Sequence, residues 1–404
     1  MDSLITAAAR ALAAGDLLGV LNRVGLRDDA HALALRGIAM AQLGDTERAK
    51  VLLRGAARAF GPRQPVARAR CIVAEAEVAL VSRDLGWPAK PLDSAGTTLE
   101  RQSDRANAAH ARYLAIRYLL LIGRLDQAER LIADFDPAPL PAASRAAYDL
   151  TVAGVAIRRL RIKAARAALT RADETARAAG ISALTAEVEN ASAVLRTPAA
   201  RLIAHGGERF LLLEEVEALL SSKAFVVDAC RHVVCHTGTV ISLETRPVLF
   251  ALARAVAEAW PGDVPRPALL ARAFGARHAD ESHRARLRVE IGRLRKALNG
   301  TAGIDATQDG FALAPQKTEE VVVLAPPTDE AHASVLTLLA DGEAWSSSAL
   351  ALGASQRTVQ RALHELMTRD KVQAVGHGRA RRWMAPPVPD FPTTLLLPAA
   401  PPGG

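Results

Sequence analysis

The stretch VEIGRLRKAL, residues 289–298, is the most informative part of this 404-residue sequence. It continues the segment ESHRARLR (281–288), and together they place Leu287, Ile291, Leu294 and Leu298 at helical spacing. On a helical wheel these four residues fall within about 60° of one another, which predicts a single buried stripe. The other side of the helix is basic. A helix with one buried stripe and an arginine-rich back fits the major groove of DNA.

The basic side chains of this helix are the first predicted DNA contacts, because arginine can fork to guanine edges or neutralise phosphates. Gly292 lies in the middle of the basic side and would permit close approach to a duplex, at a cost of about 1 kcal/mol in helix stability. We expect Arg288 and Arg293 to read bases. The full set is Arg284, Arg286, Arg288, Arg293, Arg295 and Lys296.

The residues around this helix predict a small α+β unit over residues 223–316. Short β-branched runs, KAFVVDAC and HVVCHTGTVISL, favour strands before it. The segments ETRPVLFALARAVAEAWPGD and RPALLARAFG predict two more helices, and GIDATQDGFALAP predicts a closing strand pair.

This order of elements resembles the OmpR-type winged helix, the DNA-binding effector domain of many response regulators. VEIGRLRKAL is close to that family's recognition-helix motif HISRLRRKL, LETRPVLFALARAVAE matches the helix after the sheet, and DGFAL matches the wing. Two features depart from the family. Gln308 and Asp309 stand where the wing usually carries an arginine, and no phosphoacceptor domain precedes the unit.

Residues 328–386 predict a second helix-turn-helix unit with a hairpin wing, which resembles the small winged helices of many bacterial repressors. In its third helix, SQRTVQRALHELMTRD, we expect Val359, Ala362, Leu363 and Leu366 to face the core. Its exposed face and its wing supply the second set of predicted DNA contacts, with Arg357 and Arg361 as base readers. This set is Arg357, Thr358, Gln360, Arg361, His364, Arg379, Arg381 and Arg382.

Residues 1–200 predict paired helices. Gly44-Asp45 makes a turn and Ala49 packs behind it, and Gly123 and Ala128 repeat this pattern 79 residues later. The units resemble tetratricopeptide repeats, with a spacing nearer 40 than the usual 34 residues. Such an array stacks into a curved solenoid. We expect it to bind a peptide or protein ligand or to form a homodimer, or to serve as a helical scaffold without a ligand.

The remaining segments are predicted to be a connector (201–222), a linker (317–327) and a Pro-rich, disordered tail (387–404). The predicted fold class is therefore mainly α: a helical repeat array followed by two small α+β winged-helix domains.

Composition narrows the function classes. The net charge is +8, and residues 1–200 hold 28 Lys+Arg against 21 Asp+Glu, so the excess is not a polybasic arm. Three cysteines and the lack of an apolar run of membrane-spanning length lead us to expect a reducing, cytoplasmic location and no membrane partner. Cys230, His232, Cys235 and His236 fit no zinc spacing. We expect no metal, no cofactor and no catalytic residues, hence no enzyme.

These observations predict a bacterial transcription regulator that holds double-stranded DNA through two winged-helix units. Two alternatives remain open. A replication or partition initiator also uses tandem winged helices and would bind iterated sites. A protein-interaction scaffold would show no salt-dependent DNA binding.

Overall fold

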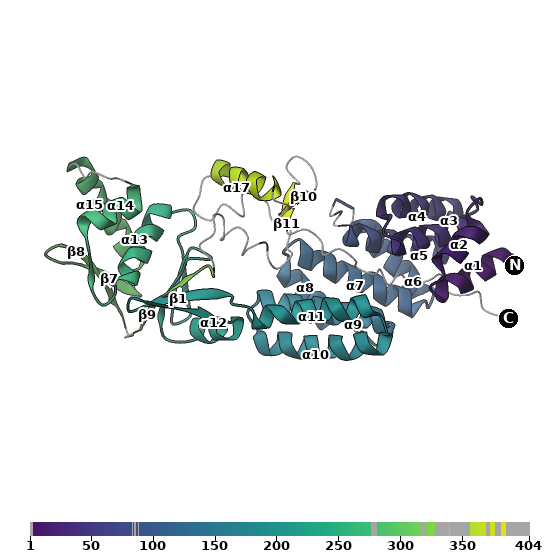
Figure 1. Cartoon of the computed structure of the whole chain (residues 1–404), viewed down its shortest axis with the longest axis horizontal. Coiled ribbons are helices and arrows are strands. Elements are labelled where there is room, and N and C mark those ends of the chain that lie inside the picture. The colour runs from purple at the N-terminus through teal and green to yellow at the C-terminus, as the bar shows by residue number, and fades with distance from the viewer. Residues whose placement is uncertain are drawn as a thin grey trace.

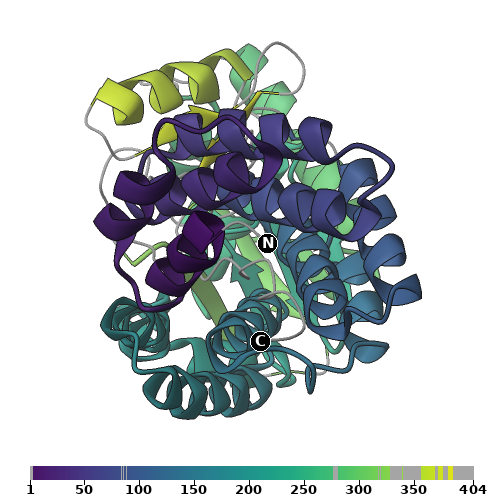
Figure 2. The same ribbon diagram turned by 90° about the vertical axis from the view of Figure 1, so that its right-hand side faces the viewer.

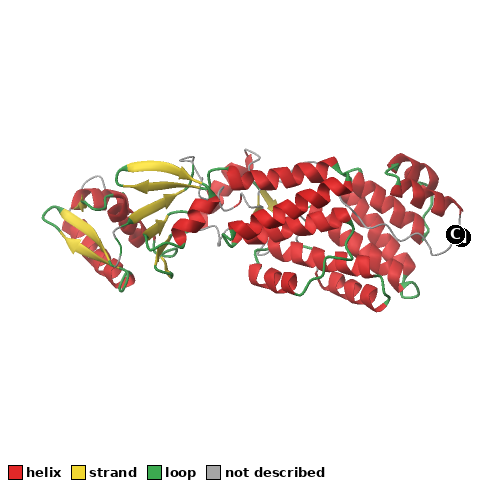
Figure 3. Ribbon diagram, turned by 90° about the horizontal axis from the view of Figure 1, so that it is seen from below, coloured by secondary structure: helices red, strands yellow, loops and turns green. Residues whose placement is uncertain are grey.

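The structure is a computed structural model that describes residues 3–82, 84, 86–87, 89–275, 281–316, 318, 320–327, 339, 356–368, 372–375 and 381–384. The described chain is mostly helical. Its strands all lie from residue 200 onward, and the larger sheets gather at one end of the molecule (Figure 3).

The first half consists of helices that follow one another through short turns. They are α1 (Ser3–Ala13), α2 (Leu17–Val24), α3 (Ala30–Gln42), α4 (Thr46–Phe60), α5 (Pro65–Val81), α6 (Ala89–Arg101), α7 (Arg105–Leu121), α8 (Leu125–Ala133), α9 (Ala142–Arg158), α10 (Ile162–Ala179), α11 (Ser182–Ala193) and the 3-10 helix η1 (Val194–Arg196).

Turn chemistry explains where these helices begin and end. Gly44 closes α3 with a φ of +87°, a conformation that glycine adopts without a Cβ penalty. The next residue, Asp45, caps α4 by accepting a hydrogen bond of 3.1 Å from Arg48 N. Gly123 repeats the positive φ between α7 and α8. Ala49 and Ala128 are both fully buried, so the turns predicted from sequence lie where two helices fold back on each other.

The helices pack as neighbours along the array. Each helix contacts the next, and α5 also contacts α7, as α7 contacts α9. A small residue allows the closest approach of α3 and α4, because a Cβ at Gly37 would lie 2.8 Å from Leu53 Cγ. Seen end-on, the hairpins form an arc that runs from α1–α4 through α7 to α10 (Figure 2).

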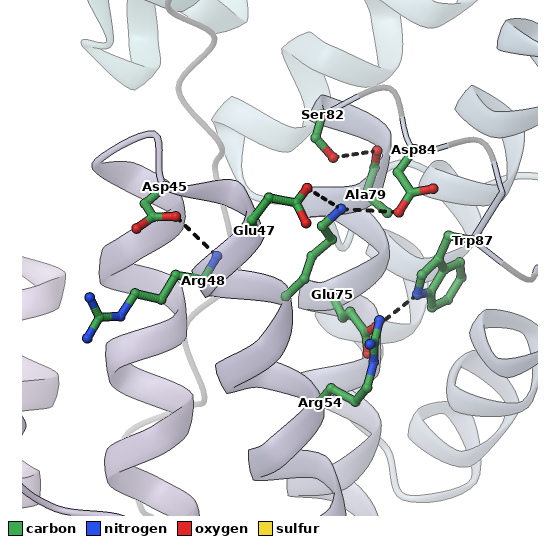
Figure 4. A network of polar contacts seen from close by, with 10 residues as sticks. Asp45, Glu47, Arg48, Arg54, Glu75, Ala79, Ser82, Asp84 and Trp87 are labelled. Atoms are coloured by element: carbon green, nitrogen blue, oxygen red, sulfur yellow. Dashed lines mark hydrogen bonds and ion pairs between the residues drawn. The ribbon is translucent and has the colours of Figure 1, made fainter. Parts of the chain in front are cut away.

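Polar contacts tie successive hairpins together (Figure 4). Glu75 of α5 is 6% exposed and accepts hydrogen bonds from Arg54 at 2.7 Å and from Trp87 Nε1 at 3.2 Å. Lys50 of α4 lies between Glu47 and Asp84, at 2.7 and 3.1 Å. Burial alone would lower the pKa of the Lys50 amine, but its bonds to these two carboxylates raise it. This network joins α4 to α5 and to the segment after it.

Beyond the array, the chain forms a six-stranded sheet in the order β2-β1-β9-β3-β4-β5. Its strands are β1 (Ala200–Ala204), β2 (Gly207–Leu211), β3 (Phe225–Asp228), β4 (Val233–His236), β5 (Thr239–Ser242) and β9 (Val321–Ala325), and α12 (Leu213–Leu220) follows β2. One face packs on α13 (Pro247–Glu258) through Val321 and Val323, and the other packs on α12 through Val322 and Leu324.

The sequence-based connector and linker need correction here. Residues 201–222 form β1, β2 and α12 rather than a plain connector. Residues 321–325 of the expected linker form β9, a central strand that pairs in parallel with β3 (Val322 with Val226) and antiparallel with β1 (Leu202 with Leu324). The run VVVLA is buried on both faces, so it lacks the alternation that marks a one-sided strand.

Three helices and a second sheet complete this unit. After α13 come α14 (Arg266–Phe274) and α15 (Glu281–Ala297), then the antiparallel hairpin β7 (Ala302–Ala306) and β8 (Gly310–Pro315). The short strand β6 (Asp263–Pro265) pairs with β8. Figure 1 shows α15 near one end of the molecule, with the array's α1 near the other end.

The last described part is small. It contains α17 (Gln356–Thr368), which packs beside the hairpin β10 (Gln373–Val375) and β11 (Arg382–Met384). Val359, Leu363 and Leu366 are at most 3% exposed and pack with Val372 and Trp383, as predicted for a helix with one apolar face. Of the two preceding helices expected in this unit, only Leu339 is described, and it is buried in the same core; the rest of them and the Pro-rich tail lie outside the described residues.

Candidate nucleic-acid interface

The long helix α15 has the two sides that its sequence predicted. Leu287, Ile291, Leu294 and Leu298 are at most 2% exposed and lie in the core with α13 and β8. All six predicted basic contacts of this segment are exposed, and Arg286, Arg288, Arg293 and Lys296 lie on the side away from the stripe, whereas Arg284 and Arg295 lie at its edge. The burial of the leucine stripe therefore fixes the direction in which the cations point.

Two of these cations are used within the protein. Arg295 Nε donates a hydrogen bond of 2.7 Å to the carbonyl oxygen of Ile304 in β7. The guanidinium of Arg286 lies 4.5 Å from the ring centroid of Phe274, a cation–π contact with α14. Arg295 thus contacts β7 and Arg286 contacts α14.

The other arginines of α15 hold surface ion pairs. Glu281 lies 3.4 Å from Arg288 and 3.6 Å from Arg284, and Glu290 lies 2.8 Å from Arg293. The side chains of Arg288 and Glu281 are 70% and 72% exposed. Exposed pairs of this kind contribute about 0–1 kcal/mol. A phosphate can therefore replace Glu281 as the partner of Arg288 at low cost.

The centre of the exposed face is open. Among the described residues, a Cβ built on Gly292 would meet no atom within 4 Å. One helical turn away on either side lie Arg288 and Lys296, and Val289, which is 53% exposed, lies beside them. The face thus presents two cations and one apolar side chain around a point where the helix has no side chain. In a DNA groove, the cations could contact phosphates while the apolar side chain contacts base edges.

A recess of about 670 Å³ lies where α15 meets the start of α13. Its walls include Arg293 and Lys296 of α15, and Arg246, Pro247 and Val248 at the first turn of α13. The first intrahelical bond of α13 runs from Phe250 N to Arg246 O, so the N–H groups ahead of it point out of the helix end. Glu290 also lines the recess and pairs with Arg293, so Arg246 and Lys296 beside the helix N-terminus are the groups that favour an anion such as phosphate.

Sequence reasoning missed Arg246. It lies 50 residues before Lys296 in the chain, and only the packing of α13 against α15 brings the two together. The Arg246-Pro247 pair was a usable signal for a helix start, because proline favours the first helical position. Nothing local in the sequence placed that start beside the basic helix.

The turn between β7 and β8 is anchored by hydrogen bonds from Arg266 of α14, and it carries an acidic residue at its tip. The Arg266 guanidinium donates to the carbonyl oxygens of Gln308 at 2.9 Å and Thr307 at 3.1 Å. Thr307 Oγ1 also bonds the Asp263 carboxylate. Gln308 and Asp309 are exposed. An exposed carboxylate is repelled by phosphate, which argues against insertion of this turn into a minor groove.

In the last unit, the structure describes some of the residues that were predicted as the second set of DNA contacts. Gln360, Arg361 and His364 are exposed on α17, opposite its buried stripe. Arg357 and Thr358 belong to the first turns of the same helix. Arg381 lies with its guanidinium 4.5 Å from the ring centroid of Trp383, and Arg382 is half-buried in β11. Arg379 lies outside the described residues.

The inside of the array carries buried ionisable groups, which could have indicated a catalytic or ligand site. His110 of α7 is fully buried, and its Nε2 lies 3.0 Å from the Glu77 carboxylate of α5. Arg117 Nη1 donates to the Tyr113 hydroxyl at 3.2 Å on α7. Burial raises the pKa of that hydroxyl above its usual value. The His110–Glu77 pair connects the stacked helices α5 and α7, whereas the Arg117–Tyr113 bond lies within α7.

The Cys230–His236 cluster is distributed along a strand and the turn before it. His232 stacks on Phe250 with ring centroids 4.3 Å apart, and burial lowers its pKa. Burial raises the pKa of the Cys230 thiol to about 12, so the thiol stays protonated. Across the described part of the chain, no group of three or more His, Cys, Asp or Glu side chains is arranged to hold a metal ion.

Comparison of the chain with protein-family models, with curated proteins and with solved structures gave no match. In the part of the chain that the structure describes, none of the helices is both long enough and apolar enough to cross a membrane.

Proposed function

We propose that this protein is a DNA-binding transcription regulator and that residues 223–316 act as a winged helix whose recognition helix is α15. The observation that carries the proposal is the geometry of α15: its leucine stripe is buried, and its basic side, open at Gly292, faces solvent. The element order strand–helix–helix–helix–hairpin supports the same function.

The cations of α15 fall into two groups according to whether they contact other parts of the protein. Arg288, Arg293 and Lys296 surround the open face or the recess at α13 and would contact DNA. Arg246 joins them as a phosphate contact. Arg286 and Arg295 hold the helix against α14 and β7. Because the β7–β8 turn is acidic at its tip, we propose that affinity comes from the major groove and its flanking phosphates.

The last unit would be a second DNA-binding module of the winged type, and the helical array would be a repeat domain that receives a signal or forms a dimer. Gln360, Arg361 and His364 are exposed on one face of α17, where Arg and Gln can bond purine edges. Two modules on one chain raise the overall affinity through effective concentration.

Fluorescence anisotropy with a random-sequence duplex at several salt concentrations tests the DNA function first. The test variant is Arg288→Ala with Lys296→Ala. The matched control is Arg166→Ala with Arg209→Ala, which removes the same charge from exposed arginines that pair with Glu214 and Glu215 in α12. We expect the test variant to reduce the slope of log affinity against log salt by about two, and the control to leave it unchanged.

Selection of bound genomic fragments then identifies the kind of DNA target. A variant with Arg288, Arg293, Arg357 and Arg361 changed to Ala would be compared with the wild type. Enrichment of promoter motifs by the wild type alone supports a regulator. Enrichment of iterated sites would instead indicate a replication or partition initiator. If the wild type shows no salt-dependent DNA binding at all, the proposal is wrong and the scaffold alternative takes its place.

A further inference from the structure

A cavity of about 590 Å³ lies where the helical array meets the six-stranded sheet. Its walls are mainly apolar. Ala153 and Ile157 of α9 and Val194 of η1 come from the array, while Val216 of α12 and Leu324 of β9 come from the sheet unit. A volume of this size matches the pockets that bind small organic molecules.

One acidic side chain among these walls stands out. Asp228, at the end of β3, is only 4% exposed and lines the cavity. One of its carboxylate oxygens accepts hydrogen bonds from the backbone N–H groups of Cys230 at 2.8 Å and Arg231 at 3.1 Å. Within the described residues, the other oxygen has no hydrogen-bond partner. Because Asp228 lines the cavity, that second oxygen is an acceptor that a hydrogen-bond donor from a ligand could use.

The charges around the cavity restrict what it can hold. Arg158 and Arg231 also line it, and Arg158 Nη1 is already bonded to the Leu120 carbonyl oxygen at 2.5 Å. The two arginines oppose a cationic ligand, and the Asp228 carboxylate opposes an anionic one. The chemistry that remains is a neutral molecule with a large apolar surface and one hydrogen-bond donor.

We propose that this cavity is an effector site for a neutral, mainly apolar small molecule that donates one hydroxyl or N–H hydrogen bond to Asp228. The proposal has two parts: that the cavity binds such a molecule, and that binding regulates the protein. The second part, the regulatory half, rests on the proposed function, because the effector would change DNA binding by α15. The physical basis is that α9 and η1 belong to the array, whereas α12, β3 and β9 belong to the unit that carries α15. An occupant in contact with both restricts their relative motion.

Binding is tested on the full chain with N-phenyl-1-naphthylamine, a neutral fluorescent probe with a single N–H donor. We expect saturable fluorescence enhancement by the wild type. Asp228→Asn keeps the acceptor oxygen for Cys230 and Arg231 but puts an amide donor in place of the free oxygen, so it should weaken probe binding about tenfold. Ala191→Phe, on a cavity-lining residue of α11, should abolish binding.

Controls separate the cavity from general effects. Asp305→Asn changes an exposed acid on β7, and Val240→Phe adds an aromatic ring at a position on β5 that is 64% exposed. Neither should alter probe binding. If Ala191→Phe fails to fold in a thermal melt, Val194→Trp replaces it, since Val194 is 44% exposed at the cavity rim. No binding by the wild type, or equal binding by the wild type and both cavity variants, overturns the site.

The regulatory half is read separately, as DNA affinity with and without saturating probe. We expect a change of about fivefold or more, because coupling between sites is typically of that size. The same change must be absent in Ala191→Phe, which is expected not to bind the probe. Probe binding without any effect on DNA affinity overturns the regulatory half alone. Loss of DNA binding by the unliganded wild type overturns the proposed function and leaves the cavity result standing.

Discussion

The Nε atom of Arg295 donates a hydrogen bond of 2.7 Å to the carbonyl oxygen of Ile304 and so joins α15 to the first strand of the β7–β8 hairpin. A residue that sequence analysis placed among the DNA contacts is therefore engaged within the protein. This bond adds a polar link to the apolar packing that holds the helix against the rest of the unit. Arg295 therefore differs from Arg288, whose exposed ion pair with Glu281 leaves it accessible to a ligand.

Replacement of Arg295 should therefore affect stability. We expect Arg295→Ala to lower the free energy of unfolding by about 1–2 kcal/mol, because the bond involves a charged donor and the Ile304 carbonyl loses its partner. Arg288→Ala, which breaks only an exposed pair with Glu281, should change it by less than about 0.5 kcal/mol. Urea unfolding measures both. Equal effects of the two variants would contradict the division of roles.

Substitution of Gly292 should raise stability and weaken DNA binding at the same time. A Cβ there meets open space, so Gly292→Ala should raise the free energy of unfolding by about 1 kcal/mol through helix propensity. If the duplex approaches the helix at this point, DNA affinity should nevertheless fall. Urea unfolding and fluorescence anisotropy on the same preparation give the two readouts. Unchanged or higher affinity would place the DNA elsewhere on the protein.

The recess at the start of α13 should contribute to DNA affinity through phosphate. Arg246 and Lys296 both line it. Arg246→Ala should weaken binding to all sequences to a similar degree and reduce the salt slope by about one. Arg272→Ala is the control, because Arg272 is exposed on α14 and pairs with Glu258 at 2.6 Å. A loss confined to particular sequences would instead make Arg246 a base contact.

Stability should depend on pH through Asp228. Burial raises the pKa of this carboxyl in the folded protein above its usual value. The folded state then binds the proton more tightly than the unfolded state, so stability falls as pH rises from the unfolded pKa through the folded one. Asp228→Asn removes that fall. We expect the variant to gain stability relative to the wild type at pH 8 and to lose this advantage at pH 4, as measured by urea unfolding. A difference independent of pH would show that the carboxyl titrates normally.

The small last unit should be sensitive to a single core change. Leu363 is fully buried in a core that includes Leu366 and Trp383. Leu363→Ala should cost about 2–5 kcal/mol, enough to unfold so small a unit. Hydrogen exchange of residues 356–368 would then become fast, while α15 stays protected. Thr368→Ala, at the exposed end of α17, should leave exchange unchanged. Slow exchange in Leu363→Ala would show that the unit draws its stability from other contacts.

The same variant measures whether two modules bind DNA. If both do, unfolding of α17 should weaken affinity for selected genomic fragments by about tenfold or more, because the gain from effective concentration is lost. The Thr368→Ala control should bind like the wild type. Unchanged affinity in Leu363→Ala would assign all DNA binding to the unit that contains α15.

Local patterns were enough to predict the helices and their exposed faces. The stripe from Leu287 to Leu298 predicted which side of α15 is buried, since apolar residues at helical spacing have one stable orientation against a core. Gly44 and Gly123 predicted two turns of the array, because a positive φ selects glycine. The exposed positions of α17 followed from the same periodicity.

Contacts between distant segments were decided only by the tertiary structure. β9 lies between β1 and β3, with Val322 opposite Val226 almost a hundred residues earlier, and a wholly apolar run carries no information about its partner or register. Arg246 reaches the basic helix, and Arg295 is drawn away from it, because of how α13 and β7 pack on α15. The cavity at Asp228 likewise has walls from segments separated by more than 150 residues. Periodicity specifies the face that an element buries, whereas the choice of what covers that face depends on the packing of the whole chain.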